Sequence, residues 1–224
     1  MVFMLYMVLI FYGQFVMRGV IEDKSSRVVE VLLSSARPHE IMTGKILGIG
    51  AAGLIQMAVW GLCLLLMSVY GALLVPADKI PIPSLSVWTV LAFLAFFVIG
   101  YFLYASLYAA LGSTGNVESE MQNLQWPALA PLIFAMIVMM AIVKNPEGTM
   151  AVVLSMIPFF SPMLMFLRIS LHSAPLGQVL ICFVLCLLTI AGMIWLAGRI
   201  FRVGILMYGK RPTLPEVLKW IKYS

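Results

Sequence analysis

Long apolar runs alternate with short polar segments along the whole chain. Five runs contain no charged residue, and they cover residues 1–17, 46–75, 86–111, 125–143 and 177–198. Each run is close to or longer than the roughly 20 residues that a helix needs to cross a bilayer. No alternation of period two, typical of β-strands, competes with them. The pattern predicts an all-α polytopic membrane protein with five transmembrane helices in a single domain, residues 1–224.

A sixth apolar run, residues 150–167, is interrupted by Pro158 and Pro162. Proline lacks a backbone N–H and breaks or kinks a helix, so a straight crossing is not expected here. Basic residues gather in segment 18–45 and in tail 199–224, and the positive-inside rule places both segments in the cytoplasm. The four unbroken runs between them already return the chain to the same side. We therefore predict that 150–167 is a re-entrant helical element.

The same count of crossings places Met1 outside the cell. The chain starts within an apolar run, and no basic residue precedes it. An outside start without an earlier crossing is unusual, because charged segments orient the first helix. We expect this chain to be the C-terminal part of a longer protein whose first helix is missing here.

Composition supports a membrane protein and excludes several other classes. Hydrophobic residues make up 63% of the chain and charged residues 10%, with a mean hydropathy of +1.07. Soluble domains carry about 25% charged residues, so a cytosolic enzyme is excluded. The net charge of +5 is explained by cytoplasmic basic loops, and no nucleic-acid partner is expected. Cys63, Cys182 and Cys186 lie in apolar runs and are interpreted as packing residues, with no metal site.

Segment 18–45 is the long polar insertion between the first two apolar runs. Its opposite charges recur at helical spacing, as in Arg18 with Glu22, and an apolar stripe runs alongside them. We predict an amphipathic helix over residues 21–35, a turn at residues 36–38, and then a long helix that enters the membrane. Such a helix could lie on anionic lipid or dock a cytoplasmic partner. Its mixed charges favour docking, since lipid-binding helices are mostly basic on their polar face.

Several segments resemble one transporter family. Within residues 22–50 the pattern comprises Glu22, Lys24, Arg27, Glu30, Pro38, Gly44 and Lys45. Segments 100–120, 157–170 and 201–223 add a tyrosine-rich helix, a Ser-Pro-x-x-Met-x-x-Arg-Ile run and a basic tail. In this order they resemble ABC-2 type permeases, and most closely the sodium-efflux NatB-type permeases. The family's first helix and extracytoplasmic domain have no counterpart before Met1.

The resemblance implies a multi-pass permease subunit of an exporter in the cell membrane, with a cytoplasmic C-terminus. It implies a separate ATPase subunit that binds ATP, a second permease subunit in a homodimer or heterodimer, and contact with membrane lipids. Charged docking contacts would come from Glu22, Lys24, Arg27 and Glu30, and apolar ones from Val28, Val31 and Leu32. The sequence contains no G-x-x-x-x-G-K-[ST] loop, so we expect no ATPase activity and no cofactor in this chain.

Tyr101, Tyr104 and Tyr108 share one face of the helix predicted over residues 86–111. Buried tyrosine hydroxyls need a partner, so these side chains form either hydrogen bonds between helices or the polar lining of a translocation path. The intramembrane amides of Gln14 and Gln56 are expected to link helices.

Small residues at Gly44, Gly48 and Ala52 predict close helix packing or a sliding face. The exported substrate stays open between sodium and a hydrophobic or lipid-like compound. A degenerate permease that acts as a scaffold or sensor partner is the alternative function.

Overall fold

The computed structural model describes residues 1–26, 38–74, 87–115 and 117–204. These residues form helices joined by turns, and no strand occurs among them. The predicted all-α class is therefore confirmed. Most of the basic tail 199–224, which the predicted topology places in the cytoplasm, lies outside the described ranges.

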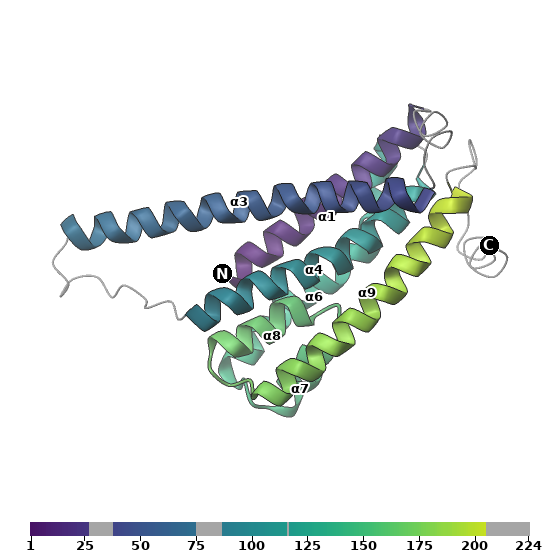
Figure 1. Ribbon diagram of the computed structural model, residues 1–224. Coiled ribbons are helices and arrows are strands. Elements are labelled where there is room, and N and C mark those ends of the chain that lie inside the picture. Colours follow the sequence, from purple (N-terminus) through teal and green to yellow (C-terminus); the bar gives the residue numbers. More distant parts are fainter. Residues whose placement is uncertain (27–37, 75–86, 116, 205–224) are drawn as a thin grey trace.

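Five long helices make up most of the described structure (Figure 1). They are α1 (Val2–Ser25), α3 (Pro38–Leu74), α4 (Val87–Thr114), α6 (Trp126–Lys144) and α9 (Leu176–Gly204). Each contains a stretch long and apolar enough to cross a membrane. The five predicted apolar runs thus correspond to five helices, and the chain is an all-α polytopic membrane protein.

Four short helices occupy the connections: η1 (Glu118–Glu120), α5 (Met121–Leu124), α7 (Thr149–Met156) and α8 (Ser161–Ser170). Helices α7 and α8 pack against each other as a hairpin. The guanidinium of Arg168, near the end of α8, bonds the carbonyl oxygen of Pro146, just before α7. This bond brings the two ends of the hairpin together. Re-entry of residues 150–167 into the membrane stays a prediction.

The breaks in this hairpin follow from its prolines. Pro158 lies in the turn between α7 and α8, and Pro162 lies in the first turn of α8, where a missing N–H is harmless. Helices α7 and α8 contain 8 and 10 residues, well short of the roughly 20 that cross a bilayer.

Helix α4 is the centre of the bundle and contacts α1, α3, α8 and α9. It approaches α1 closely because glycines line the crossing. A Cβ atom on Gly13 of α1 would lie 2.2 Å from the ring of Tyr108, and one on Gly112 would lie 2.9 Å from the carbonyl oxygen of Met17. Any side chain at either glycine would push the two helices apart, so these positions fix the distance between α1 and α4.

Helix α3 diverges from the other helices along its length (Figure 1). Gly50 and Gly53 pack against aromatic rings of α4 and α1. A Cβ atom on Gly44 or Gly48 would meet no atom of the described residues within 4 Å, so the close packing predicted at these two positions is not seen there. Beyond Met57, none of the described side chains of α3 is buried.

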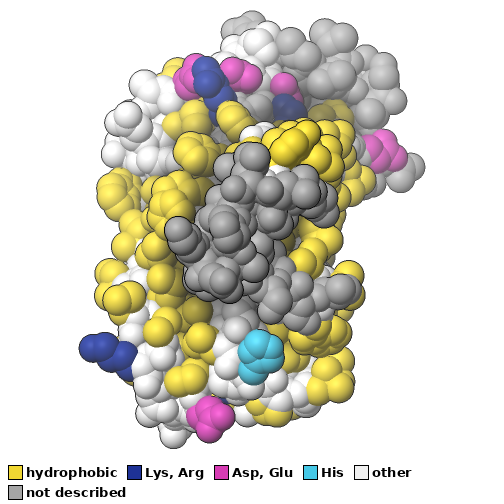
Figure 2. Space-filling model, turned by 90° about the vertical axis from the view of Figure 1, so that its left-hand side faces the viewer, with side chains coloured by type: hydrophobic (Ala, Val, Ile, Leu, Met, Phe, Trp, Pro, Cys, Tyr) yellow, Lys and Arg dark blue, Asp and Glu magenta, His cyan; other side chains and the backbone are white. Residues whose placement is uncertain are grey.

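Figure 2 shows charged side chains near the two ends of the molecule and hydrophobic side chains between them.

The end of the first helix differs from the sequence prediction. Helix α1 continues to Ser25 instead of ending at residue 17, so residues 21–25 are its last turn and not the start of a separate helix. The helix continues because Lys24 is buried against α4 and Asp23 meets Lys45, so both charges have partners. The long helix that starts at Pro38 occurs as predicted, and residues 36 and 37 of the predicted turn lie outside the described residues.

The hairpin predicts a definite labelling pattern in membranes. In a background without native cysteines, single cysteines at positions 147 and 172 should react with an impermeant maleimide from the same side. A cysteine at position 118, at the other end of the bundle, should react from the opposite side. Labelling of positions 147 and 172 from opposite sides would show that 150–167 crosses the membrane.

Candidate functional site

The coupling end is defined here as the end of the bundle where α1 ends, α3 begins and α4 ends. Arg18 of α1 pairs with Glu118 at 2.6 Å and with Glu22 at 3.3 Å. All three side chains are at least half exposed. Exposed ion pairs contribute typically under about 1 kcal/mol. These contacts therefore orient the 115–120 connection against α1 without locking it.

A second ion pair joins α1 to α3. Lys45 contacts the carboxylate of Asp23, and its ammonium also donates to the carbonyl oxygen of Gly19 at 2.6 Å. Both side chains of the pair are about three-quarters buried or more. Partial burial and a second acceptor make this pair stronger than the exposed ones, since screening by water is weaker. The last turns of α1 are thus held to the first turns of α3.

Lys24 joins α1 to α4. Its side chain is 3% exposed, and its ammonium donates to the carbonyl oxygen of Ser113 at 3.2 Å. That carbonyl lies in the last turn of α4, where helix carbonyls lack an intrahelical partner. The sequence predicted Lys24 as a charged docking contact, but in this structure it is an internal link. Its neighbour Asp23 faces α3, so consecutive residues bind two different helices.

The other predicted docking residues can be placed only in part. Glu22 is exposed at the coupling end, where it contacts Arg18. The remaining five lie outside the described residues: Arg27, Val28, Glu30, Val31 and Leu32. Docking by this segment stays a prediction.

The three tyrosines of α4 are all buried, but their hydroxyls differ in their partners. Tyr101 donates to the carbonyl oxygen of Ile46 on α3 at 2.5 Å. Tyr104 donates to the carbonyl oxygen of Phe159, in the turn between α7 and α8, at 2.6 Å. Of the two alternatives given by the sequence, hydrogen bonding between elements describes these two tyrosines.

Tyr108 has a fully buried hydroxyl that finds no hydrogen-bond partner among the described residues. Its ring packs against Gly13, which gives it space between α1 and α4. An unpaired buried hydroxyl is costly, about 1–3 kcal/mol, and calls for an explanation such as a bound water or a functional contact. Tyr108 is therefore the one tyrosine of this face for which the path-lining hypothesis stays open.

The intramembrane amides form links between helices, as predicted. Gln14 of α1 donates to the side-chain oxygen of Gln125, just before α6, at 2.9 Å. Gln56 of α3 accepts a hydrogen bond from the hydroxyl of Tyr12 on α1 at 3.0 Å. Helix α1 is thus bonded through side chains to its neighbours on both sides.

Sequence reasoning missed the role of Arg168 in the hairpin. Its guanidinium is 1% exposed and bonds Pro146, Ser155, Ser173 and Gln178 at 2.8–3.4 Å. These four groups come from the start and middle of the hairpin, the following turn and α9. Burial lowers the pKa of the Arg168 guanidinium, and nearby Glu147 opposes this shift. The available signal was a single arginine inside the apolar run 161–171.

The tyrosine contacts predict different effects of three matched substitutions. Tyr101→Phe and Tyr104→Phe should each lower stability by about 0.5–1.5 kcal/mol, because each leaves a carbonyl without its partner. Tyr108→Phe should leave stability unchanged or raise it, because it removes an unpaired hydroxyl. Thermal unfolding in detergent measures all three.

The same variants separate structure from transport. If Tyr108 lines a path, Tyr108→Phe should change transport while the melting temperature stays the same. A loss of stability in Tyr108→Phe equal to that in Tyr104→Phe would show that the hydroxyl has a structural partner.

Comparisons with known proteins agree on one family. Residues 1–199 match the family model described as ABC-2 family transporter protein. The chain is 34% identical over 228 residues to the uncharacterized protein YhaP of Bacillus subtilis (strain 168), covering 100% of this chain and 54% of that protein. It is 31% identical over 220 residues to the uncharacterized protein MJ1024 of Methanocaldococcus jannaschii, covering 98% of this chain and 52% of that protein.

The chain thus spans about half the length of these two relatives. No solved structure matches it significantly. The family match extends over most of the chain and includes all five long helices of the structure, at least in part. On this evidence the chain belongs to the ABC-2 family of transporter proteins.

Proposed function

We propose that this chain is the membrane-spanning permease subunit of an ABC exporter, driven by a separate ATPase subunit. The observation that carries the proposal is the family match over residues 1–199. The absence of a phosphate-binding loop from the sequence fits a subunit whose ATP is bound by its partner. The NatB-like subtype rests on the sequence pattern at Glu22, Lys24 and Gly44-Lys45.

The coupling end supplies a route for the work of the ATPase. Segment 27–37 joins the last turn of α1 to the start of α3. Asp23 binds α3 through Lys45, and Lys24 binds α4 through the Ser113 carbonyl. A partner that displaces segment 27–37 therefore acts on three helices at once. In this proposal the coupling end and the C-terminal tail face the cytoplasm, in the cell membrane.

The assembly needs further partners. A second permease subunit, identical or different, would complete the path, and membrane lipids would surround the rest. An added Cβ at Gly44 or Gly48 would meet none of the described residues within 4 Å, and small residues of this kind allow another helix to approach closely. Membrane topology explains the basic residues, so the proposed assembly contains no nucleic acid.

Two substrate classes enter the proposal. The resemblance to sodium-efflux permeases supports sodium. Among the described residues, the buried polar side chains are serines, Lys24 and Arg168, and none of them is a carboxylate. This composition supports a hydrophobic or lipid-like compound. The two classes can be distinguished by measuring the efflux of sodium and of a lipid-like compound from the same vesicles.

Docking through segment 27–37 predicts a selective loss of the ATPase. Leu32→Asp should reduce co-purification of the ATPase by tenfold or more, because buried apolar anchors cost about 2 kcal/mol or above when disrupted. Arg27→Glu should have a smaller effect. Val117→Asp is the matched control, since Val117 is exposed at the same end and is not part of the docking segment.

The readouts are pull-down of the tagged ATPase and its stimulated hydrolysis, with membrane insertion checked in parallel. Normal co-purification and hydrolysis with Leu32→Asp would contradict the docking assignment. Docking and hydrolysis without transport of either substrate class would favour the scaffold or sensor function instead.

A further inference from the structure

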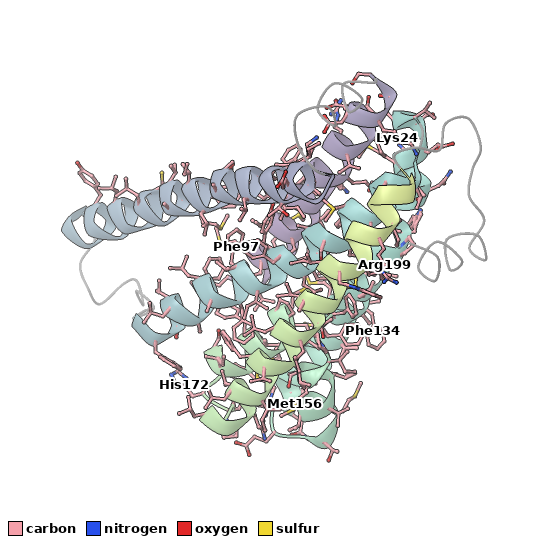
Figure 3. The ribbon with its side chains drawn as sticks, turned by 45° about the vertical axis from the view of Figure 1, so that its right-hand side comes forward. Lys24, Phe97, Phe134, Met156, His172 and Arg199 are labelled. Atoms are coloured by element: carbon pink, nitrogen blue, oxygen red, sulfur yellow. The ribbon has the colours of Figure 1, made fainter. Side chains whose placement is uncertain are left out.

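A polar cavity opens at the hairpin end of the bundle, the end at which α6 finishes and α9 begins. Its volume is about 460 Å³. The polar lining residues are Glu147, Arg168, His172, Ser173 and Gln178. They come from the connection before α7, the end of α8, the following turn and the start of α9. Figure 3 labels His172 on the outside of the molecule near this hairpin.

Arg168 lines this cavity, where its charge is felt by the exposed carboxylate of Glu147 although the two side chains form no ion pair in the described structure. Its four hydrogen-bond acceptors are neutral: two backbone carbonyls, the Ser155 hydroxyl and the Gln178 amide oxygen. Among the described residues no carboxylate forms an ion pair with it. Buried charges are normally paired, because removing an ion from water costs several kcal/mol. The cavity beside Arg168 is where a neutralising anion would fit.

The guanidinium keeps capacity for such an anion. It carries five N–H donors, and the structure assigns four hydrogen bonds to them. The contact of Nη2 with the Ser173 carbonyl is long, at 3.4 Å, and is therefore the one most readily exchanged. Arginine binds carboxylates and phosphates through two parallel N–H bonds, which its planar fork allows.

The rim of the cavity has one group that would help an anion and one that would oppose it. His172 is exposed and adopts a left-handed conformation with φ of 57°, uncommon outside glycine, which sets its side chain at the cavity. Glu147 is the acidic residue of the lining, and it is exposed. The 29-residue helix α9 begins at Leu176 beside this rim, so its positive end adds to the local potential.

We propose that this cavity binds a phosphate group, held by the guanidinium of Arg168 and by His172. The phosphate is either that of a lipid head group or a free ion. The exposed apolar residues Leu171, Leu176 and Leu180 border the same region, which allows a lipid to place its acyl chains against the protein. This inference is independent of the proposed function, because the binding requires neither the ATPase nor transport.

The test uses the purified protein in a neutral detergent. One arm measures thermal stabilisation by inorganic phosphate against chloride at equal ionic strength. The other arm measures retention of phosphatidylglycerol against a diacylglycerol with the same acyl chains. Stabilisation by phosphate alone identifies a free ion, and selective retention of phosphatidylglycerol identifies a lipid head group. Equal behaviour in both comparisons would overturn the proposal.

Rim variants keep the test independent of the folding role of Arg168. Glu147→Gln removes the opposing charge and should tighten binding severalfold, whereas His172→Ala should weaken it severalfold. Lys144→Gln is the matched control, because Lys144 is an exposed cation of the same end that does not line the cavity. Arg168→Lys, where it folds, should lose most of the binding while keeping the charge.

The pattern across variants distinguishes a site from general attraction. If Lys144→Gln weakens binding as much as His172→Ala does, the binding is nonspecific electrostatic attraction and the proposal is overturned. The same conclusion would follow if Glu147→Gln left the affinity unchanged.

Discussion

The arrangement depends on finding partners for polar groups where water is scarce. Helix ends and breaks leave carbonyl oxygens without intrahelical partners. The buried side chains reach such oxygens from other elements: Lys24 bonds Ser113 at the end of α4, Tyr104 bonds Phe159 between α7 and α8, and Arg168 bonds Pro146 before α7. Each contact satisfies a donor and an acceptor together, and each fixes where one element ends relative to another.

The two ends of the bundle use this principle differently. At the coupling end, Arg18 shares its charge with two exposed carboxylates, and such pairs are weak and exchange easily. At the hairpin end, a single buried guanidinium joins four segments, and removing it would leave several groups unpaired. The coupling end also has the less exposed links of Lys24 and Lys45, so the exposed pairs of Arg18 are the weaker part of that end.

The sequence predicted the elements well, because each depends on a local signal. The lengths of the apolar runs predicted the five long helices, and Pro158 and Pro162 predicted the break in the hairpin. The burial of Lys24 could not be predicted, since it depends on where α4 ends, 89 positions later. The hydrogen bonds of Arg168 could not be predicted either, because its partners are neutral groups that form no recognisable pattern in the sequence. For Tyr101, Tyr104 and Tyr108, spacing gave the shared face but not which hydroxyl lacks a partner.

Helix α4 is the physical link between the two ends. Its last turn accepts the hydrogen bond from Lys24, and its middle donates through Tyr104 to the hairpin turn. Helices transmit a displacement over their length when the contacts at each end have alternative arrangements. The glycines at the α1–α4 crossing hold these two helices in direct contact, with no gap between them. Helix α4 meets the hairpin through the Tyr104–Phe159 hydrogen bond and through direct packing on α8, where the rings of Phe93 and Phe166 lie 5.6 Å apart.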